Sequence, residues 1–222
     1  MIGDPVTTSK AEVKNLDAYG HVTGTSLYVD DLPILEGTLY AQVFYSPLAH
    51  GIIRSINTSE AAKLAGVVRI FSCDDVPGEN QIGGIVPDEP LLADGRVHYI
   101  GQPILLIVAK TPAVAHGARQ LISIDIDPLE VITNPREAAA RGDLLHSSRC
   151  FEVGDLDKGF EEATIIVEGE VEMGGQEHVY IEPQGAYAQP MENGSIKIYS
   201  STQGPTHGQK TAARVLGVPM HK

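Results

Sequence analysis

The sequence is poor in cysteine, in basic residues and in long apolar runs. Its two cysteines, Cys73 and Cys150, lie far apart without a CxxC motif, so we expect two reduced thiols and no disulfide. Lys and Arg number 16 against 29 Asp and Glu, and the net charge of -13 repels phosphate backbones, which argues against a nucleic-acid partner. The longest apolar run, residues 104–109, is too short to span a bilayer and predicts a buried strand. Residues 1–5 show no signal-peptide pattern, so we expect a cytoplasmic protein without a membrane partner.

The composition that remains is globular, with 42% hydrophobic and 20% charged residues, and its first part alternates strands with helices. The pattern predicts strands at residues 38–45, 51–56, 67–71, 96–100, 104–109 and 122–127. Asn57 with Glu60 caps one intervening helix, which we expect to end at Gly66, and Thr111 followed by Pro112 opens the other. This alternation predicts an α/β or α+β domain over residues 24–128, preceded by an amino-terminal arm, residues 1–23.

Residues 129–153 lose this periodicity apart from a short helix at 136–141, and we expect them to connect two domains. The second block, residues 154–222, starts with a short helix capped by Asp155. It continues with predicted strands at 164–173, 185–189 and 195–200, a hairpin turn at 192–194 and a helix at 205–216 that Gly217 ends. The chain stops soon after that helix, so we expect a fragment of a longer protein.

Chemically versatile side chains are concentrated in residues 173–184 and 199–205. Gln203 follows the predicted strand 195–200 and precedes the helix opened by Pro205. Backbone N–H groups are free at such a position, and ligands that carry oxygen or negative charge are favoured there. Gln203 either contacts a ligand or only satisfies the helix terminus, and we take it as the candidate binding residue.

Three other groups of residues suggest chemistry but have simpler explanations. Glu177, His178 and Glu182 could form a metal site, but adjacent residues point apart on a strand, so we favour buried, hydrogen-bonded structural roles. Gly174 and the glycine after it should permit a sharp backbone bend. His50 has no Ser or Cys partner motif and is expected to be a turn residue. The aspartate pairs at 30–31 and 74–75 could suggest cations but more often form turns and caps, and the acidic residues 168, 170 and 172 should face solvent or an interface.

Several short motifs occur in an order and at a spacing that identify a family. They are Val22-Thr-Gly24, Tyr28-Val-Asp-Asp31, Ala49-His50, Ile53 to Ala61, Asp74 to Gly78, Asp88-Glu89, Gly101, Gly154-Asp155, Gly174-Gly-Gln-Glu-His178 and Ser201-Thr-Gln203. With these motifs the chain resembles, from about Val22 to Pro219, the amino-terminal part of the molybdenum-binding subunit of the xanthine dehydrogenase and aldehyde oxidase family.

This resemblance implies an α+β fold: an a/b hammerhead domain at 24–128, then a truncated α+β molybdopterin-binding domain at 154–222. The family's glutamine in the Ser-Thr-Gln motif lies beside molybdenum and hydrogen-bonds an oxygen ligand, and Gln203 inherits this role. A neutral amide suits it, because it can donate a hydrogen bond without adding charge. The parent enzyme should hydroxylate a purine or related heterocycle, or oxidise an aldehyde, with water as the oxygen source. The Gly-Gly-Gln-Glu-His motif favours a xanthine-type member of the family.

The resemblance also shows what this chain does not contain. The family's glycine-rich cofactor loop and its substrate-binding and base residues come later in the family's sequence, and no iron–sulfur or flavin motif is present. We therefore expect partners that supply the rest of the molybdenum subunit, the iron–sulfur clusters and the FAD, a small-molecule substrate, and self-association through uncovered apolar surface. The fragment alone should hold no cofactor and be inactive. The alternative is a free-standing, non-catalytic hammerhead-like assembly module.

Overall fold

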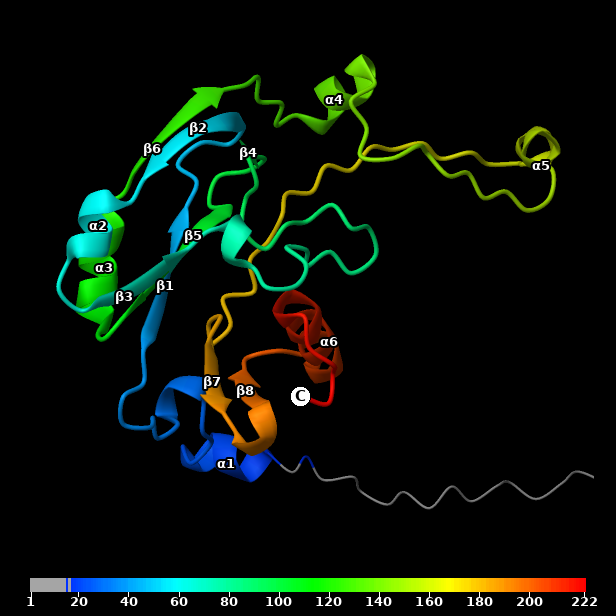
Figure 1. Ribbon diagram of the computed structural model, residues 1–222. Coiled ribbons are helices and arrows are strands. Elements are labelled where there is room, and N and C mark those ends of the chain that lie inside the picture. The colour runs from blue at the N-terminus through cyan, green and yellow to red at the C-terminus, as the bar shows by residue number, and fades with distance from the viewer. Residues whose placement is uncertain (1–14, 16) are drawn as a thin grey trace, which may run out of the picture. The chain divides into compact units, whose positions relative to one another are not determined.

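The computed structural model describes residue 15 and residues 17–222 (Figure 1). Much of the expected amino-terminal arm, residues 1–23, therefore lies outside the described residues. The chain divides into two compact units. We call Leu39–Tyr180 the central unit, and the described residues up to Thr38 together with Ile181–Lys222 the terminal unit.

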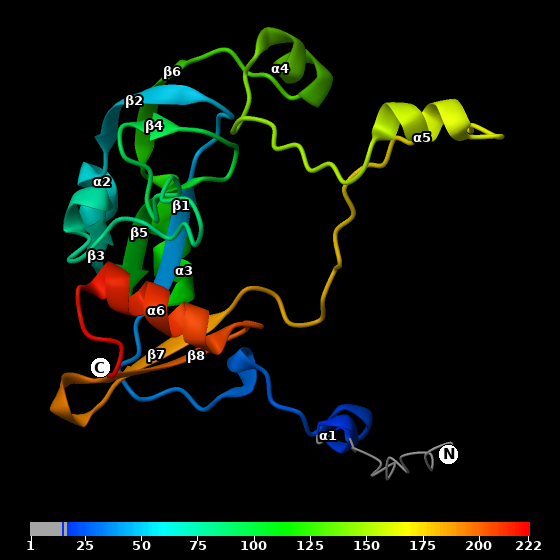
Figure 2. The same ribbon diagram turned by 90° about the vertical axis from the view of Figure 1, so that its right-hand side faces the viewer.

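The central unit contains two antiparallel sheets of three strands each. The first has the order β1 (Tyr40–Tyr45), β5 (Pro103–Ala109), β3 (Val67–Phe71), and the second has the order β4 (Arg96–Val97), β2 (Gly51–Asn57), β6 (Ser123–Pro128). Helix α3 (Pro112–Gln120) packs against β1 and β5, and α2 (Ser59–Lys63) lies beside α3 (Figures 1 and 2). Because all strand pairs are antiparallel, the unit is α+β and not a parallel α/β domain.

The apolar run at residues 104–109 forms the central strand of the first sheet, and its burial confirms the prediction. Ile104 and Ile107 are almost completely buried in β5, which is hydrogen-bonded on both edges. Thr111 caps α3 through its hydroxyl, which accepts the N–H of Val114 at 3.2 Å, as the Thr-Pro pattern predicted. The core cluster comprises Ala61, Ala93, Val97, Ile104, Leu105, Ile107, Ala118 and Ile122.

Two local expectations for the central unit were too long. The strand expected at 96–100 ends at Val97, because the chain turns through Gly101, whose φ is 86°. The helix expected to end at Gly66 ends at Lys63. Its N-cap is Thr58, while the Asn57 carboxamide accepts the N–H of Ser59 at 3.0 Å.

The last part of the central unit has little regular structure. Helix α4 (Pro135–Arg141) matches the short helix expected at 136–141, and its cap is Asn134. Helix α5 (Leu156–Glu162) is capped by Asp155, as predicted. Every residue from 139 to 180 is exposed. The strand expected at 164–173 is absent, because no segment of the described residues pairs with it and a lone strand cannot satisfy its backbone. The acidic side of this segment is exposed as expected, and Glu170 pairs with Arg136 at 2.5 Å.

The terminal unit is built on one hairpin and one helix. Strands β7 (Ala186–Pro190) and β8 (Ile196–Ser200) pair antiparallel around the 3-10 turn η3 (Glu192–Gly194), which confirms the predicted hairpin. Helix α6 (Pro205–Leu216) ends at Gly217, whose φ is 67°. The unit also contains α1 (Ala18–Thr23) and the 3-10 turn η1 (Val29–Asp31).

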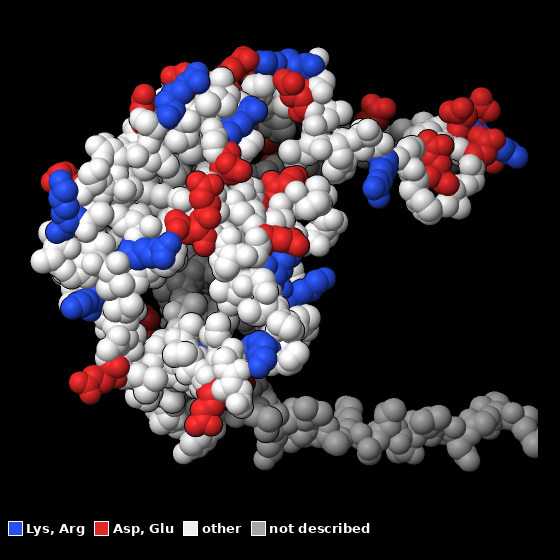
Figure 3. Space-filling view, viewed as in Figure 1, with Lys and Arg blue, Asp and Glu red and all other residues white. Residues whose placement is uncertain are grey.

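Three further features are the distribution of surface charge, the length of apolar helices and the state of the cysteines. On the face shown in Figure 3, acidic and basic side chains are interspersed, and the basic ones form no continuous patch. In the part of the chain that the structure describes, no helix is long and apolar enough to cross a membrane. The described cysteines, Cys73 and Cys150, are both free thiols.

Candidate functional site

Gln203 lies in the short connection from β8 to α6, which we call the Gln203 turn (Ser201–Gly204). Its side chain is exposed, and its amide makes no hydrogen bond within the described residues. The Thr202 hydroxyl accepts the N–H of Gly204 at 3.1 Å, and this hydrogen bond within the turn stabilises its conformation. The predicted position, between a strand end and a helix start, is therefore confirmed. The binding role of Gln203 stays a prediction.

The amino terminus of α6 leaves donors available beside this amide. Gly204 is the N-cap and has no side chain to offer, and Pro205 at the first helical position has no N–H. Among the described residues, no acceptor is found for the backbone N–H groups of Thr206 and His207. Free N–H groups and the positive end of the helix dipole favour an oxygen-rich or anionic group. The Gln203 turn thus presents hydrogen-bond donors and no carboxylate.

A groove adjoins the turn between β8 and α6, and the sequence pattern did not reveal it. Its volume is about 600 Å³. The lining residues include Ile198, Ser200, Thr202, Pro205, Thr206 and Gln209. The groove is thus bounded by both apolar and hydroxyl-bearing side chains.

The segment Ile181–Gly185 runs beside the exit of β8 and is fixed to it. The Ser201 hydroxyl accepts the N–H of Gly185 at 2.9 Å and donates to the Pro183 carbonyl oxygen at 2.9 Å. The backbone N–H of Ser201 also donates to the Gly185 carbonyl oxygen at 3.1 Å. Sequence reasoning did not assign this role to Ser201, although its place directly after the strand was visible.

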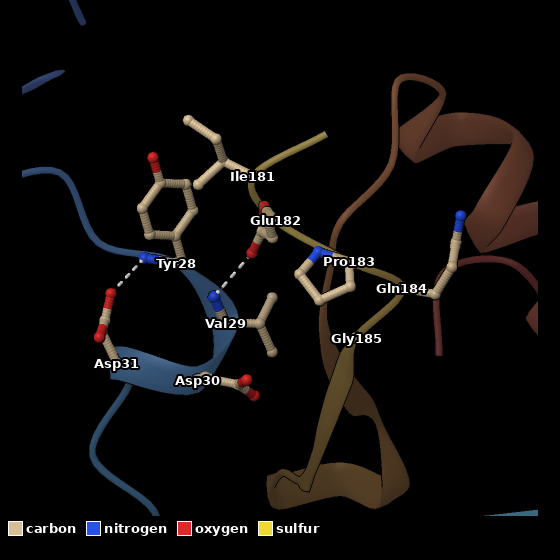
Figure 4. Close-up of a pocket in the computed structure, with 9 residues that line it drawn as sticks. All are labelled: Tyr28, Val29, Asp30, Asp31, Ile181, Glu182, Pro183, Gln184 and Gly185. Atoms are coloured by element: carbon tan, nitrogen blue, oxygen red, sulfur yellow. Dashed lines mark hydrogen bonds between the residues drawn. The ribbon is translucent and has the colours of Figure 1, made fainter. Parts of the chain in front are cut away.

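On its other side the same segment is tied to residues near the amino terminus. The Glu182 carboxylate accepts the backbone N–H of Val29 at 2.8 Å, across 153 positions of sequence (Figure 4). Residues 28–31 and 181–185 enclose a pocket of about 210 Å³. Glu182 therefore has a partly buried, hydrogen-bonded structural role, as expected.

The rest of the polar segment does not match its expectation. Glu177 and His178 are exposed, so the prediction that they are buried and hydrogen-bonded is wrong, since none of the described residues covers residues 139–180. The backbone shows no bend at Gly174 or Gly175, so that prediction is wrong as well. Among the described residues, no group of His, Cys, Asp and Glu could hold a metal ion.

His50 is a turn residue, as expected. Its Nδ1 donates to the Glu130 carbonyl oxygen at 2.6 Å, and its Nε2 accepts from the Arg96 guanidinium at 2.5 Å. The neighbouring His98 stacks on it, with 6.2 Å between ring centroids. Burial, with Arg96 and His50 nearby, holds the pKa of His98 below its ordinary value.

The aspartate pairs form turns, as expected. Asp31 accepts the N–H of Tyr28 at 3.0 Å in η1, and Asp75 accepts the N–H of Ser72 at 2.9 Å in η2 (Cys73–Asp75). The hydrogen bond from Ser72, together with Arg69, lowers the pKa of Asp75. The Asp31 and Asp75 carboxylates thus accept backbone N–H groups three residues earlier in the chain.

Comparison with known proteins agrees with this architecture. Residues 23–130 match the model of the aldehyde oxidase and xanthine dehydrogenase a/b hammerhead domain, and residues 140–222 match that of the molybdopterin cofactor-binding domain. The chain is 37% identical over 206 residues to a xanthine dehydrogenase of Dictyostelium discoideum, which covers 93% of this chain and 15% of that protein. It is 35% identical over 221 residues to an aldehyde oxidase 2 of Cavia porcellus, which covers 99% of this chain and 16% of that protein.

A solved structure shares the fold. The aldehyde oxidoreductase of Desulfovibrio gigas superposes with a TM-score of 0.77 at 27% identity, over 93% of this chain and 25% of that one. The chain thus combines an a/b hammerhead domain with sequence of the molybdopterin cofactor-binding domain type. The chain belongs to the xanthine dehydrogenase and aldehyde oxidase family. It spans between about a seventh and about a quarter of the length of these relatives.

Proposed function

We propose that this chain is part of the molybdenum-binding subunit of a cytoplasmic hydroxylase, and that Gln203 contacts its cofactor. The parent enzyme oxidises a purine or related heterocycle, or an aldehyde, with water as the source of oxygen. Its electrons leave through iron–sulfur and flavin centres on other domains or subunits. The names of the similar proteins, which include both xanthine dehydrogenases and aldehyde oxidases, support this substrate range.

The observation that carries the proposal is the exposed, unpaired amide of Gln203 at the start of α6. When bound, the molybdenum cofactor supplies the oxidising centre. Gln203 donates an N–H to an acceptor atom of that cofactor and so fixes its orientation. The free N–H groups of Thr206 and His207 add positive potential on the same side.

The test is a substitution of Gln203 in the complete enzyme. Gln203→Ala removes one hydrogen bond in a site that excludes water, worth about 1–3 kcal/mol. If this loss falls on the transition state, turnover drops roughly 10- to 100-fold, while molybdenum content is unchanged. Gln203→Glu has the same size but lacks the N–H donor, and it should lose at least as much.

Gln120→Ala serves as the control. Gln120 is an exposed glutamine of α3 in the central unit, and its amide is hydrogen-bonded to the side chain of His116. Normal turnover of Gln203→Ala at full molybdenum content would refute the proposed contact.

A second experiment concerns this 222-residue chain by itself. Only one contact to the cofactor is assigned here, whereas a pterin with its phosphate needs many hydrogen bonds. We therefore expect the purified chain to hold no molybdenum and to reduce no dye with xanthine or with an aldehyde. Stoichiometric molybdenum, or substrate-dependent dye reduction, would show that the site is complete within this chain.

A further inference from the structure

Ser201 is the last residue before Gln203 that is fixed by long-range hydrogen bonds. The ladder between β7 and β8 ends with the pair Ala186 and Ser200. The Ser201 N–H adds one more bond of the same kind, to the Gly185 carbonyl oxygen at 3.1 Å. Beyond Ser201, the hydrogen bonds of the described turn are local: the Gly204 N–H donates to the Thr202 hydroxyl at 3.1 Å, and the Gly204 carbonyl oxygen accepts the N–H of Gly208 at 2.9 Å.

The side chain of Ser201 adds hydrogen bonds between the end of β8 and the segment Ile181–Gly185 that the backbone does not provide. Its oxygen accepts from the Gly185 N–H at 2.9 Å, and its single proton goes to the Pro183 carbonyl oxygen at 2.9 Å, the nearer of two acceptors. One hydroxyl thus joins a donor and an acceptor of a neighbouring segment. The direction in which the chain leaves β8 is therefore defined by a short side chain with few rotamers.

We propose that Ser201 is a positioning residue for Gln203. Its hydroxyl holds the exit of β8 against Pro183 and Gly185, so that the amide two residues later points consistently at the cofactor. The inference rests on the proposed contact of Gln203. It goes beyond that contact, because it states that the Ser201 side chain, which does not itself touch the cofactor, determines how accurately the Gln203 amide is placed.

The experiment is a double-mutant cycle on turnover per molybdenum in the complete enzyme. Ser201→Ala should lower kcat about 3- to 10-fold with KM unchanged, because the amide remains but is less well placed. The double variant Ser201→Ala, Gln203→Ala should be no slower than Gln203→Ala alone, since Ser201 acts through Gln203. Ser201→Thr, which keeps the hydroxyl, should recover most of the rate.

Ser195→Ala is the matched control, because it also deletes a serine hydroxyl with a hydrogen bond, to the Glu192 carbonyl oxygen at 3.1 Å in the hairpin turn. It should leave kcat unchanged. The second readout needs no cofactor: in this chain, Ser201→Ala should speed hydrogen exchange at the Gly185 amide, and Ser195→Ala should not.

Each outcome decides a separate question. If Gln203→Ala is normal, the proposed contact of Gln203 with the cofactor is wrong, and this inference fails with it. If Gln203→Ala is slow but Ser201→Ala is normal, only the positioning role is wrong. Additive losses in the double variant, or a Ser201→Thr enzyme as slow as Ser201→Ala, would show that the hydroxyl does not act through Gln203.

Discussion

The hydrogen bond between Glu182 and Val29 makes a quantitative prediction about the terminal unit. The carboxylate accepts one backbone N–H at 2.8 Å, and both groups are partly buried. A hydrogen bond to a charged group contributes about 1.5–3 kcal/mol. Partial exposure to water weakens it, so we expect Glu182→Ala to cost about 1–2 kcal/mol in the local stability of residues 28–31.

Amide hydrogen exchange of Val29, measured by NMR on this chain, detects that cost directly. If exchange follows local opening, its rate rises with the opening equilibrium. At about 1.4 kcal/mol per factor of ten, the Val29 amide should exchange roughly 5- to 30-fold faster in Glu182→Ala. Glu182→Gln keeps an acceptor oxygen without the charge and should show a smaller increase.

Glu177→Ala is the matched control, because Glu177 lies five residues earlier, is exposed and has no partner within the described residues. It should leave Val29 exchange unchanged. The reasoning would be refuted by equal Val29 protection in wild type and Glu182→Ala, since the carboxylate would then not hold that amide.

Three further predictions concern the central unit. Ile107→Ala should lower its free energy of unfolding in urea by about 2–5 kcal/mol, and Val68→Ala, at an exposed site of β3, by no more than about 0.5 kcal/mol. The lowered pKa of Asp75 means that its contribution to stability is present above its ordinary pKa of 3.8 and is lost as pH falls further, so Asp75→Asn should flatten the acid limb of a Tm-against-pH curve. Limited proteolysis should cut first within residues 129–153, which are exposed from 139 onward, and release a stable piece ending near Asp127; a first cut inside residues 104–124 would contradict this boundary.

The elements that could be predicted from sequence are those with local causes. The buried strand at 104–109 follows from an unbroken apolar run, and the caps at Thr111 and Asp155 depend on residues at most three positions away. The strand expected at 164–173 has the right alternation, but pairing needs a second strand, which the described chain does not provide. The position of Gln203 between β8 and α6 could be predicted for the same reason, because it depends only on neighbouring residues.

The parts of the site that could not be predicted from the sequence depend on hydrogen bonds between residues near the amino terminus and residues near the carboxyl terminus of the chain. Val29 and Glu182 lie 153 positions apart, and Leu35, whose N–H donates to the Tyr187 hydroxyl at 3.0 Å, lies 152 positions from its partner. No periodicity or spacing relates such residues.

These two hydrogen bonds bear on how the chain is divided into structural units. The hammerhead match begins at residue 23, yet residues up to Thr38 cluster with Ile181–Lys222 and hydrogen-bond to that part of the chain. In sequence, the central unit is thus inserted between the two halves of the unit that carries Gln203. A piece that starts at residue 154 would contain Gln203 and Ser201 but would lack Val29 and Leu35, which Glu182 and Tyr187 hold. We therefore expect the amino-terminal residues to be needed for a well-ordered Gln203 turn, although they lie farthest from it along the chain.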